Sequence, residues 1–466
     1  MIADWDNTYA RLPNQMYAQQ VPTPVASPSG LALNKNLAAD LGISFDSDWF
    51  EYMSGNKLPY GANPISQAYA GHQFGHWNPQ LGDGRAILLG EVTGGFGHID
   101  LQLKGAGRTP WSRSGDGRAW YGPILREYLV SEAMHSLGIP TTRALAAAAT
   151  GEKIFREQGP LPGAVICRTA SSHIRVGTFQ YFASRNDLQA LQSLFDYTVR
   201  RHFPEAKTVE DLLQEAVKKH ASLVASWMAV GFIHGVMNTD NSHVAGITID
   251  YGPCAFMDYF VPTKVFSSID RQGRYAYNNQ AKMAAWNLAQ LATALLPLAT
   301  ERESAIEHYT EIIHGFSDTF EKAYDKAYSQ KIGYSASKES SKMIQSLLKM
   351  MAEQGADYTL TFRALGEGTV DEHLGDHPDF KQWYENWLNG AKMKELHKVN
   401  PAIIPRNHLI EEMISKATTG DMELFYSLSH ALNTPFEHPQ NPRLGMPPEI
   451  NAVSYTHLTL PTRSYV

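Results

Sequence analysis

Three polar side chains between residues 240 and 250 could carry out chemistry on a phosphate ester. Asn241 and Asp250, nine residues apart, offer oxygen ligands on neighbouring loops. Such groups suit Mg²⁺, which nucleotide sites bind through one or two protein ligands together with phosphates and water. Asp240 is the remaining carboxylate nearby, so it is the candidate base toward a hydroxyl. Side chains of adjacent residues in extended backbone point apart, so Asn241 can face a metal while Asp240 faces a nucleophile.

The surrounding residues follow a protein-kinase pattern with one position changed. A kinase catalytic loop runs His-Arg-Asp, four residues and Asn, and a later Asp-Phe-Gly supplies a second metal ligand. His234 and Asn241 keep this spacing, and Asp250-Tyr-Gly stands where the second motif belongs, but the position of the kinase base is Val236. The pattern therefore predicts either an inactive kinase or different chemistry on the same nucleotide.

A lysine and a glutamate upstream extend this pattern. Lys104 ends the alternating run 100–104, which predicts a strand, and Glu127 lies in a predicted helix over 123–136. Taken alone, each is more commonly a solvated surface residue. Because Asp250-Tyr-Gly follows downstream, we interpret Lys104 and Glu127 as a phosphate-binding lysine and its orienting partner.

Three glycine turns followed by arginine add evidence for an anion site. They are Gly82-Asp-Gly-Arg85, Gly105-Ala-Gly-Arg108 and Asp116-Gly-Arg118. Glycine lets backbone N–H groups approach a phosphate, and arginine adds a two-pronged donor. No Walker pattern occurs, which disfavours a P-loop enzyme. Arg168 and Arg175 could likewise clamp a phosphate, or each could pair with a surface carboxylate.

Bulk properties exclude several classes of protein. The chain has 466 residues, a net charge of −7 and a pI near 6.2, which argues against general nucleic-acid binding. Cys167 and Cys254 have no zinc spacing, and His72 and His76 lie outside any HExxH pattern. The acidic N-terminus has no apolar signal segment, and no apolar run approaches a membrane span, so we expect a cytoplasmic protein that does not bind membranes.

The order of strand-like and helical segments along the chain predicts an α+β fold in two lobes. Residues 1–64 are predicted to be an extension that packs on the lobes, with a helix over 31–41. Residues 65–183, with strand-like runs and glycine turns, indicate a kinase-like small lobe, and 184–445 a helical large lobe. Predicted helices there include 303–328, and 365–378 is predicted to be a loop. Residues 446–466 form an atypical tail, for which an artefact of sequence determination is one interpretation.

Four long motifs resemble those of the SelO/YdiU family. They are 69–85 (YAGHQFGHWNPQLGDGR), 102–113 (QLKGAGRTPWSR), 172–182 (SHIRVGTFQYF) and 234–241 (HGVMNTDN). The resemblance covers roughly residues 5–445. It implies a protein-kinase-like fold and an enzyme that transfers AMP from ATP to Ser, Thr or Tyr hydroxyls of proteins, with Mg²⁺ or Mn²⁺ as cofactor.

The resemblance also implies a role for each candidate residue. ATP would lie flipped, with Arg168 and Arg175 holding the buried γ-phosphate. Asp240 would be the proton acceptor, Glu127 would orient Lys104, and the metal ligands would be Asn241 and Asp250. The nucleotide contacts would be Gly82, Gly84, Arg85, Lys104, Asp116, Gly117, Arg168, Arg175 and Asp250.

Three alternatives remain open from the residues. They are UMP transfer from UTP with Mn²⁺, phosphate transfer by a kinase, and a non-catalytic pseudokinase that only binds nucleotide. Family members typically end in a segment with cysteine or selenocysteine, whereas no cysteine follows Cys254 here. The resemblance therefore gives no basis for redox control through a C-terminal thiol.

Overall fold

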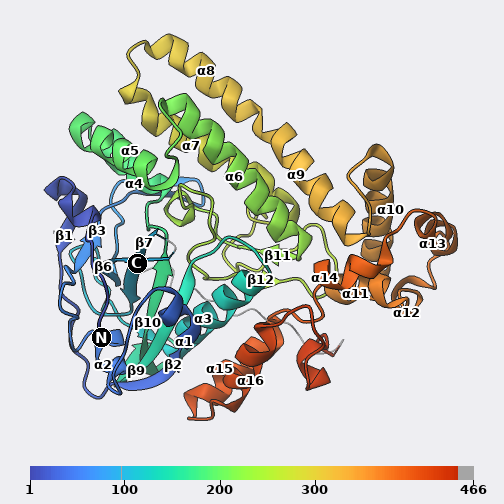
Figure 1. The fold of residues 1–466 in the computed structure, drawn as a ribbon, viewed down its shortest axis with the longest axis horizontal. Helices are drawn as coiled ribbons and strands as arrows, with labels where there is room; N and C mark the ends of the chain where they lie inside the picture. The colour runs from blue at the N-terminus through green and yellow to red at the C-terminus, as the bar shows by residue number, and fades with distance from the viewer. Residues whose placement is uncertain (96, 450–466) are drawn as a thin grey trace.

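The computed structural model describes residues 1–95 and 97–449. It is a mixed α+β structure in which a sheet lies on one side and most helices lie on the other (Figure 1). The strands are β1 (Tyr17–Gln19), β2 (Ser29–Leu33), β3 (Ile65–Gln67), β4 (Gly71–Gln73), β5 (His76–Asn78), β6 (Ala86–Gly94), β7 (Gly97–Lys104), β8 (Ala119–Trp120), β9 (Arg143–Arg156), β10 (Gly159–Ala170), β11 (Phe232–Ile233) and β12 (Ala255–Phe256).

The helices follow the chain from the sheet into the helical part. They are α1 (Lys35–Asp40), α2 (Trp49–Met53), α3 (Tyr121–Ser136), α4 (Val176–Ala183), α5 (Leu188–His202), α6 (Val209–Ala229), α7 (Gln280–Leu295), α8 (Arg302–His314), α9 (Phe316–Lys331), α10 (Lys338–Gln354), α11 (Tyr358–Glu367), α12 (Asp371–Leu374), α13 (Phe380–Leu388), α14 (Leu396–Val399), α15 (Asn407–Thr418) and α16 (Glu423–Leu432). No helix of the described residues is long and apolar enough to cross a membrane.

The main sheet is antiparallel and takes two of its strands from the first 64 residues. Its order is β1-β3-β6-β7-β10-β9-β2, and β8 pairs with β10. The prediction of a helix over 31–41 was wrong at its start, because β2 covers Ser29–Leu33 and α1 begins at Lys35. The reason is tertiary: β9 offers β2 backbone partners along one edge, and these satisfy its hydrogen bonds as a strand.

The sheet separates two hydrophobic cores. Leu101 and Leu103 of β7 face a core shared with α1 and α2, together with Cys167 of β10. The alternate residues face the other core, which is shared with α3, so Gln102 and Lys104 point toward that helix. This alternation is what turns the polar side chains of β7 toward Glu127.

Two further predictions about the helical part need correction. The single helix expected over 303–328 is broken at Gly315 into α8 and α9. The expected loop over 365–378 contains the end of α11 and the short helix α12. Glycine disfavours continuation of a helix, and α12 buries Leu374 against its neighbours. Most of the tail, 450–466, lies outside the described residues.

Candidate active site

Three cations converge on two carboxylates where the sheet meets the loop after β11. Lys104 Nζ lies 2.5 Å from Glu127 Oε2 and 3.5 Å from Asp250 Oδ1. Arg168 Nη1 lies 2.5 Å from Asp250 Oδ1 and 3.2 Å from Glu127 Oε1, and Arg175 pairs with the other oxygen of Asp250. We call these five residues the cation cluster. Its arginines pair with buried carboxylates rather than with surface ones.

Different elements bring the members of the cation cluster together. In the sheet register Arg168 of β10 lies opposite Gln102 of β7, which puts the arginine on the same face as Lys104. Gln102 Oε1 accepts a hydrogen bond of 2.8 Å from Arg168 Nε. Glu127 reaches the cluster from α3, and Arg175 stands directly before α4. Residues far apart in sequence thus share one buried site.

The helix that carries Glu127 is anchored to the helical part through its neighbour Arg126. This buried guanidinium donates to Asn407 Oδ1 at 2.8 Å and to the carbonyl of Cys254, four residues after Asp250. The helices α15 and α16 also pack on α3. The position of Glu127 is therefore tied to the loop that carries Asp250.

Asp250 is held in a demanding conformation by the charges around it. Its φ is +61°, a left-handed value that residues other than glycine, Asn and Asp rarely adopt. Burial by itself would raise the pKa of Asp250, but Arg168, Arg175 and Lys104 together hold it well below its usual range. Burial lowers the pKa of Lys104, against the charges of Glu127 and Asp250. The cluster is a concentration of positive charge that Asp250 partly neutralises.

The three glycine turns also meet in space. Gly105 N donates to Arg85 O at 2.7 Å, and Gly107 N donates to Gly117 O at 3.0 Å. The Arg85 side chain forms no hydrogen bond or ion pair with any described residue, and burial lowers its pKa. A Cβ at Gly117 would collide with the backbone of Gly107. An arginine without a described partner beside closely packed glycines suits the binding of an anion.

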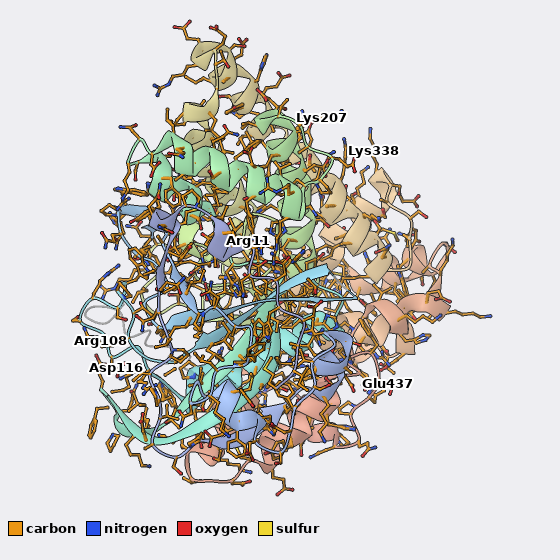
Figure 2. All side chains as sticks on the ribbon, turned by 60° about the vertical axis from the view of Figure 1, so that its left-hand side comes forward. Arg11, Arg108, Asp116, Lys207, Lys338 and Glu437 are labelled. Atoms are coloured by element: carbon orange, nitrogen blue, oxygen red, sulfur yellow. The ribbon has the colours of Figure 1, made fainter. Side chains whose placement is uncertain are left out.

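Asp116 stands apart from the cation cluster. Its carboxylate is engaged by Arg156 at 2.8 Å and accepts from the backbone of Arg118 at 2.9 Å. Figure 2 shows Asp116 beside Arg108 at the outer edge of the sheet part. The loop between β7 and β8 turns the carboxylate outward, whereas the adjacent Gly117 faces the glycine turns.

Asp240 lies under the hairpin formed by β4 and β5. Gln73 Nε2 donates to Asp240 Oδ2 at 3.0 Å, whereas Oδ1 is buried and has no partner in the described part of the chain. A Cβ at Gly71 would stand 2.9 Å from that Oδ1, so only glycine allows the hairpin to approach so closely. The Asp240 carbonyl accepts 2.6 Å from Arg175 Nη1, which links it to the cluster.

The electrostatics of Asp240 suit a proton acceptor near neutral pH. Burial raises its pKa to about 6, against the hydrogen bond from Gln73 and the charge of Arg175, which lower it. The side chain is 7% exposed. A carboxylate with a raised pKa and one free oxygen can take a proton at pH 7 and still release it afterwards.

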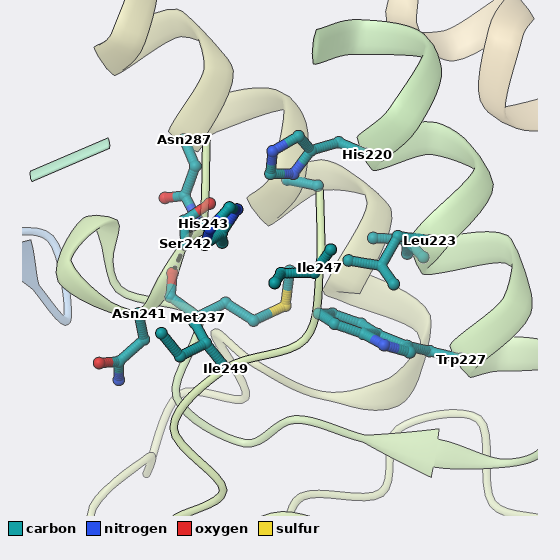
Figure 3. Close-up of a pocket in the computed structure, with 12 residues that line it drawn as sticks. His220, Leu223, Trp227, Met237, Asn241, Ser242, His243, Ile247, Ile249 and Asn287 are labelled. Atoms are coloured by element: carbon teal, nitrogen blue, oxygen red, sulfur yellow. Dashed lines mark hydrogen bonds between the residues drawn. The ribbon is translucent and has the colours of Figure 1, made fainter. Parts of the chain in front are cut away.

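Asn241 supplies a second oxygen ligand next to Asp240. Its Nδ2 donates 3.1 Å to Val236 O, which leaves the amide oxygen as the free acceptor. Behind this loop lies a small cavity whose lining includes His220, Asn287 and Asn241 (Figure 3). In Figure 3 the Asn241 side chain points away from His220, and no member of the cation cluster lines the cavity. The cavity is therefore separate from the cation cluster.

The protein groups present fit a metal ion that is held mainly by the phosphates of a bound nucleotide. No group of three or more His, Cys, Asp or Glu residues among 1–95 and 97–449 could hold a metal ion alone. Asn241 offers one amide oxygen and Asp250 one carboxylate, which is the number of groups that Mg²⁺ takes from proteins when phosphates and water complete its shell. The residues present therefore fit a divalent metal that arrives with a nucleotide.

Sequence reasoning missed three supporting residues. Gln73 holds Asp240, and Gln102 connects Arg168 to Asp83 through a hydrogen bond of 3.1 Å to the Asp83 carboxylate. Asp83 in turn accepts from the backbone of Gln67 at 3.1 Å, which fixes the first glycine turn. Each lies in a motif that carries the family resemblance, but only spatial contact reveals its role.

The comparisons with known proteins agree on one enzyme class. Relatives named protein nucleotidyltransferase YdiU include one from Ruegeria sp. (strain TM1040), 54% identical over 442 residues that cover 93% of each chain. Another, from Ruegeria pomeroyi, is 51% identical over 459 residues, or 96% of this chain and 97% of the relative. A third, from Bacillus thuringiensis, is 50% identical over 455 residues, or 93% of each chain. The chain is thus an enzyme of the nucleotidyltransferase class.

The family is more specific than the class. A family model described as protein adenylyltransferase SelO matches residues 2–433, and the chain belongs to this family. The match contains every candidate site residue named above.

Proposed function

We propose that this enzyme transfers AMP from ATP to Ser, Thr or Tyr hydroxyls of proteins and releases pyrophosphate. The observation that carries the proposal is the pair of changes in the loop after β11. The position of the kinase base holds Val236, which is buried. Asp240, in contrast, has a buried carboxylate oxygen without a partner among the described residues, and its backbone carbonyl accepts from Arg175. A base moved in this way suits attack at a different phosphorus atom.

Asp240 would act as the proton acceptor. The acceptor hydroxyl loses its proton to the carboxylate as its oxygen attacks the α-phosphorus. The bond from the α-phosphorus to the bridging oxygen breaks, and pyrophosphate leaves with that electron pair. Gln73 keeps one carboxylate oxygen occupied, so the free Oδ1 is the one that meets the hydroxyl. The chemistry is mainly positioning and electrostatics.

The cation cluster would hold the pyrophosphate part of a flipped ATP. Lys104, Arg168 and Arg175 supply three positive charges in a buried site, where charge acts strongly. Arg85 and the backbone of Gly82, Gly84 and Gly117 would complete the cradle, with Asp116 near its edge. Asn241 and Asp250 would hold Mg²⁺ or Mn²⁺, which when bound neutralises phosphate charge.

We also propose that the two parts correspond to kinase-like lobes, 65–183 and 184–445, with 1–64 as an extension. The support is the contact between Lys104 on a strand and Glu127 on the following helix, which has the form of the kinase pair. UMP transfer from UTP remains the second candidate, because no described contact selects a base. The relatives' broader name, protein nucleotidyltransferase, favours keeping it.

Radiolabelled nucleotide separates the candidates. The enzyme is incubated with a protein mixture and ATP labelled at either the α- or the γ-phosphate, with UTP labelled at the α-phosphate in parallel. We expect protein labelling from α-labelled ATP and none from γ-labelled ATP. Label from the γ-position would identify a kinase, and preferred labelling from UTP would identify UMP transfer. Absence of label with nucleotide still bound would identify a non-catalytic binder.

Lys104→Ala should lower kcat/KM for AMP transfer by at least about tenfold, roughly 1.4 kcal/mol of barrier. The reason is the loss of one of three charges that would stabilise the leaving group, while Glu127 is left without its closest partner. Initial rates at several ATP concentrations measure the effect. Lys338→Ala, at an exposed lysine of α10, is the matched control and should leave the rate unchanged. An unchanged rate in Lys104→Ala would remove the lysine from the site.

Gln73→Leu should shift the acid limb of the pH–rate profile to higher pH. The hydrogen bond from Gln73 stabilises the ionised carboxylate and lowers the pKa of Asp240, so its loss raises that pKa from about 6. The variant should therefore lose most activity below neutral pH and recover at higher pH. Gln192→Leu, which removes a 2.9 Å bond to the carboxylate of Asp196, is the control. A uniform loss at every pH would point to a merely structural role.

A further inference from the structure

Four arginines lie near the two ends of the hairpin that covers Asp240, and their side chains form ion pairs with none of the carboxylates among the described residues. We call Arg108, Arg113, Arg185 and Arg274 the arginine rim. The first three are exposed and the fourth is half-buried. None forms an ion pair with any of the described residues. The chain as a whole has a net charge of −7, whereas these arginines form a local region of positive charge near one hairpin.

Hydrogen bonds fasten two rim arginines to the chain that follows the hairpin and a third to one of these two. Arg185 Nη2 donates to Pro79 O at 2.9 Å, and Arg113 Nη2 donates to Gln80 O at 3.4 Å. Arg108 Nη2 donates to Arg113 O at 2.9 Å. Arg185 and Arg113 therefore lie along 79–80, a few residues from Gln73, and Arg108 lies next to Arg113. Each of the three keeps N–H donors that no described residue uses.

Arg274 closes the rim on the other side of the hairpin. Its Cζ lies 4.7 Å from the centre of the Trp286 ring, and that ring lies 5.3 Å from the ring of His72. A Cβ at Gly75, at the tip of the hairpin, would stand 3.6 Å from Arg274 Cζ. Between the two sides the hairpin exposes His76 and Trp77, the latter 40% exposed. Cations and an aromatic ring thus lie next to the hairpin that covers Asp240.

Two carboxylates close in sequence to rim arginines, Asp187 and Asp270, accept hydrogen bonds from other groups. Asp187 accepts from Ala190 N at 3.1 Å and from Gln15 Nε2 at 3.1 Å. Asp270 accepts from the backbone N–H groups of Arg274 and Tyr275 at 2.8 and 2.7 Å. Neither neutralises a rim guanidinium. The positive charge of the rim is therefore available to a partner.

We propose that the arginine rim binds the acceptor protein, and that the acceptor hydroxyl lies in an acidic segment with Asp or Glu within a few residues on either side. This inference rests on the proposed function, because that function makes the bound protein the acceptor of AMP. Binding of the segment itself does not depend on transfer. Arginine pairs with carboxylates through two parallel hydrogen bonds. The hairpin covers Asp240, so a segment bound to the rim lies next to the site of transfer.

Peptides that differ only in charge test the inference. Three peptides carry one Ser in identical positions, flanked by Glu, by Gln or by Lys, each with a fluorescent label. Binding to the full chain is measured by fluorescence anisotropy, and transfer from α-labelled ATP is measured separately. We expect the acidic peptide to bind at least about fivefold more tightly than the Lys peptide, as for one or more exposed ion pairs. The preference should weaken as salt rises.

The double variant Arg113→Glu/Arg185→Glu should lose this preference, with a raised KM for the acidic peptide and nearly unchanged kcat and ATP affinity. Both residues are exposed, so folding should survive. Lys207→Glu/Lys338→Glu makes the same change in charge at exposed lysines of the helical part, away from Arg108 in Figure 2, and should keep the preference.

The outcomes distinguish a failure of the rim proposal from a failure of the proposed AMP transfer. Equal binding of the acidic and Lys peptides, or a preference that both double variants lose equally, would overturn the rim proposal and leave AMP transfer standing. A preference that only the rim variant loses supports the rim even where α-labelled ATP labels no protein, an outcome that would instead overturn the proposed function.

Discussion

Asp250→Asn should abolish measurable AMP transfer, a loss of at least about a thousandfold, or roughly 4 kcal/mol of barrier. The substitution removes the one charged group that we propose as a metal ligand. It also leaves Lys104 and Arg168 with Glu127 as their single carboxylate partner, and Arg175 with none, among the described residues. Metal-free ATP should bind at least as tightly as before, because the carboxylate that now occupies the two arginines no longer competes with phosphates.

Asn is the informative replacement at this position. It tolerates the left-handed backbone with φ +61°, whereas alanine would add strain of its own. Transfer is measured with α-labelled ATP, and ATP binding is measured by calorimetry with and without Mg²⁺. A thermal unfolding midpoint close to that of the wild type excludes a general loss of structure. Transfer at the wild-type rate would show that Asp250 is not part of the catalytic site.

Asp240→Asn should lower kcat by about a thousandfold, within the range that general bases contribute. The amide keeps the shape of the side chain, and its oxygen can still accept the hydrogen bond from Gln73, but it cannot take the hydroxyl proton. ATP affinity should change little, because Asp240 touches the cation cluster only through its backbone carbonyl. The acid limb near pH 6 should disappear from the residual activity.

The pH profile decides whether Asp240 is the base. Rates of wild type and variant are compared from pH 5 to pH 8 with saturating ATP. Asp376→Asn makes the same chemical change at an exposed site of the helical part and should leave the profile unaltered. A residual rate that still rises through pH 6 would assign that titration to another group. An unreduced kcat would make Asp240 a bystander.

The local pattern of the sequence was enough to find the elements that carry the site. Alternation in 100–104 predicted a strand with Lys104 on its polar face, and the helix over 123–136 was expected within two residues of its observed start. The spacing from His234 to Asn241, and the motifs that resemble the SelO family, pointed to nucleotide chemistry. Such features repeat over a few residues, so the sequence displays them directly.

Local propensity failed where distant partners set the structure. The alanine-rich run in 143–156 favours a helix by propensity, yet it forms β9 because β10 and β2 offer backbone partners on both sides. Residues 29–33 became a strand for the same reason. The partners of Arg168 and Arg175 were equally beyond local reasoning, because Glu127 and Asp250 lie between 41 and 82 residues away.

The sequence by itself therefore indicated the enzyme class and the family, which the relatives and the family model confirm, and it supplied the residues that we propose for the chemistry. The tertiary structure alone decided which of them meet. It gathered three cations around Asp250, turned Asp116 toward Arg156, and laid Gln73 over Asp240. The physical reason is that burial and charge pairing depend on neighbours in space, and sheet pairing and helix packing choose those neighbours across long stretches of chain.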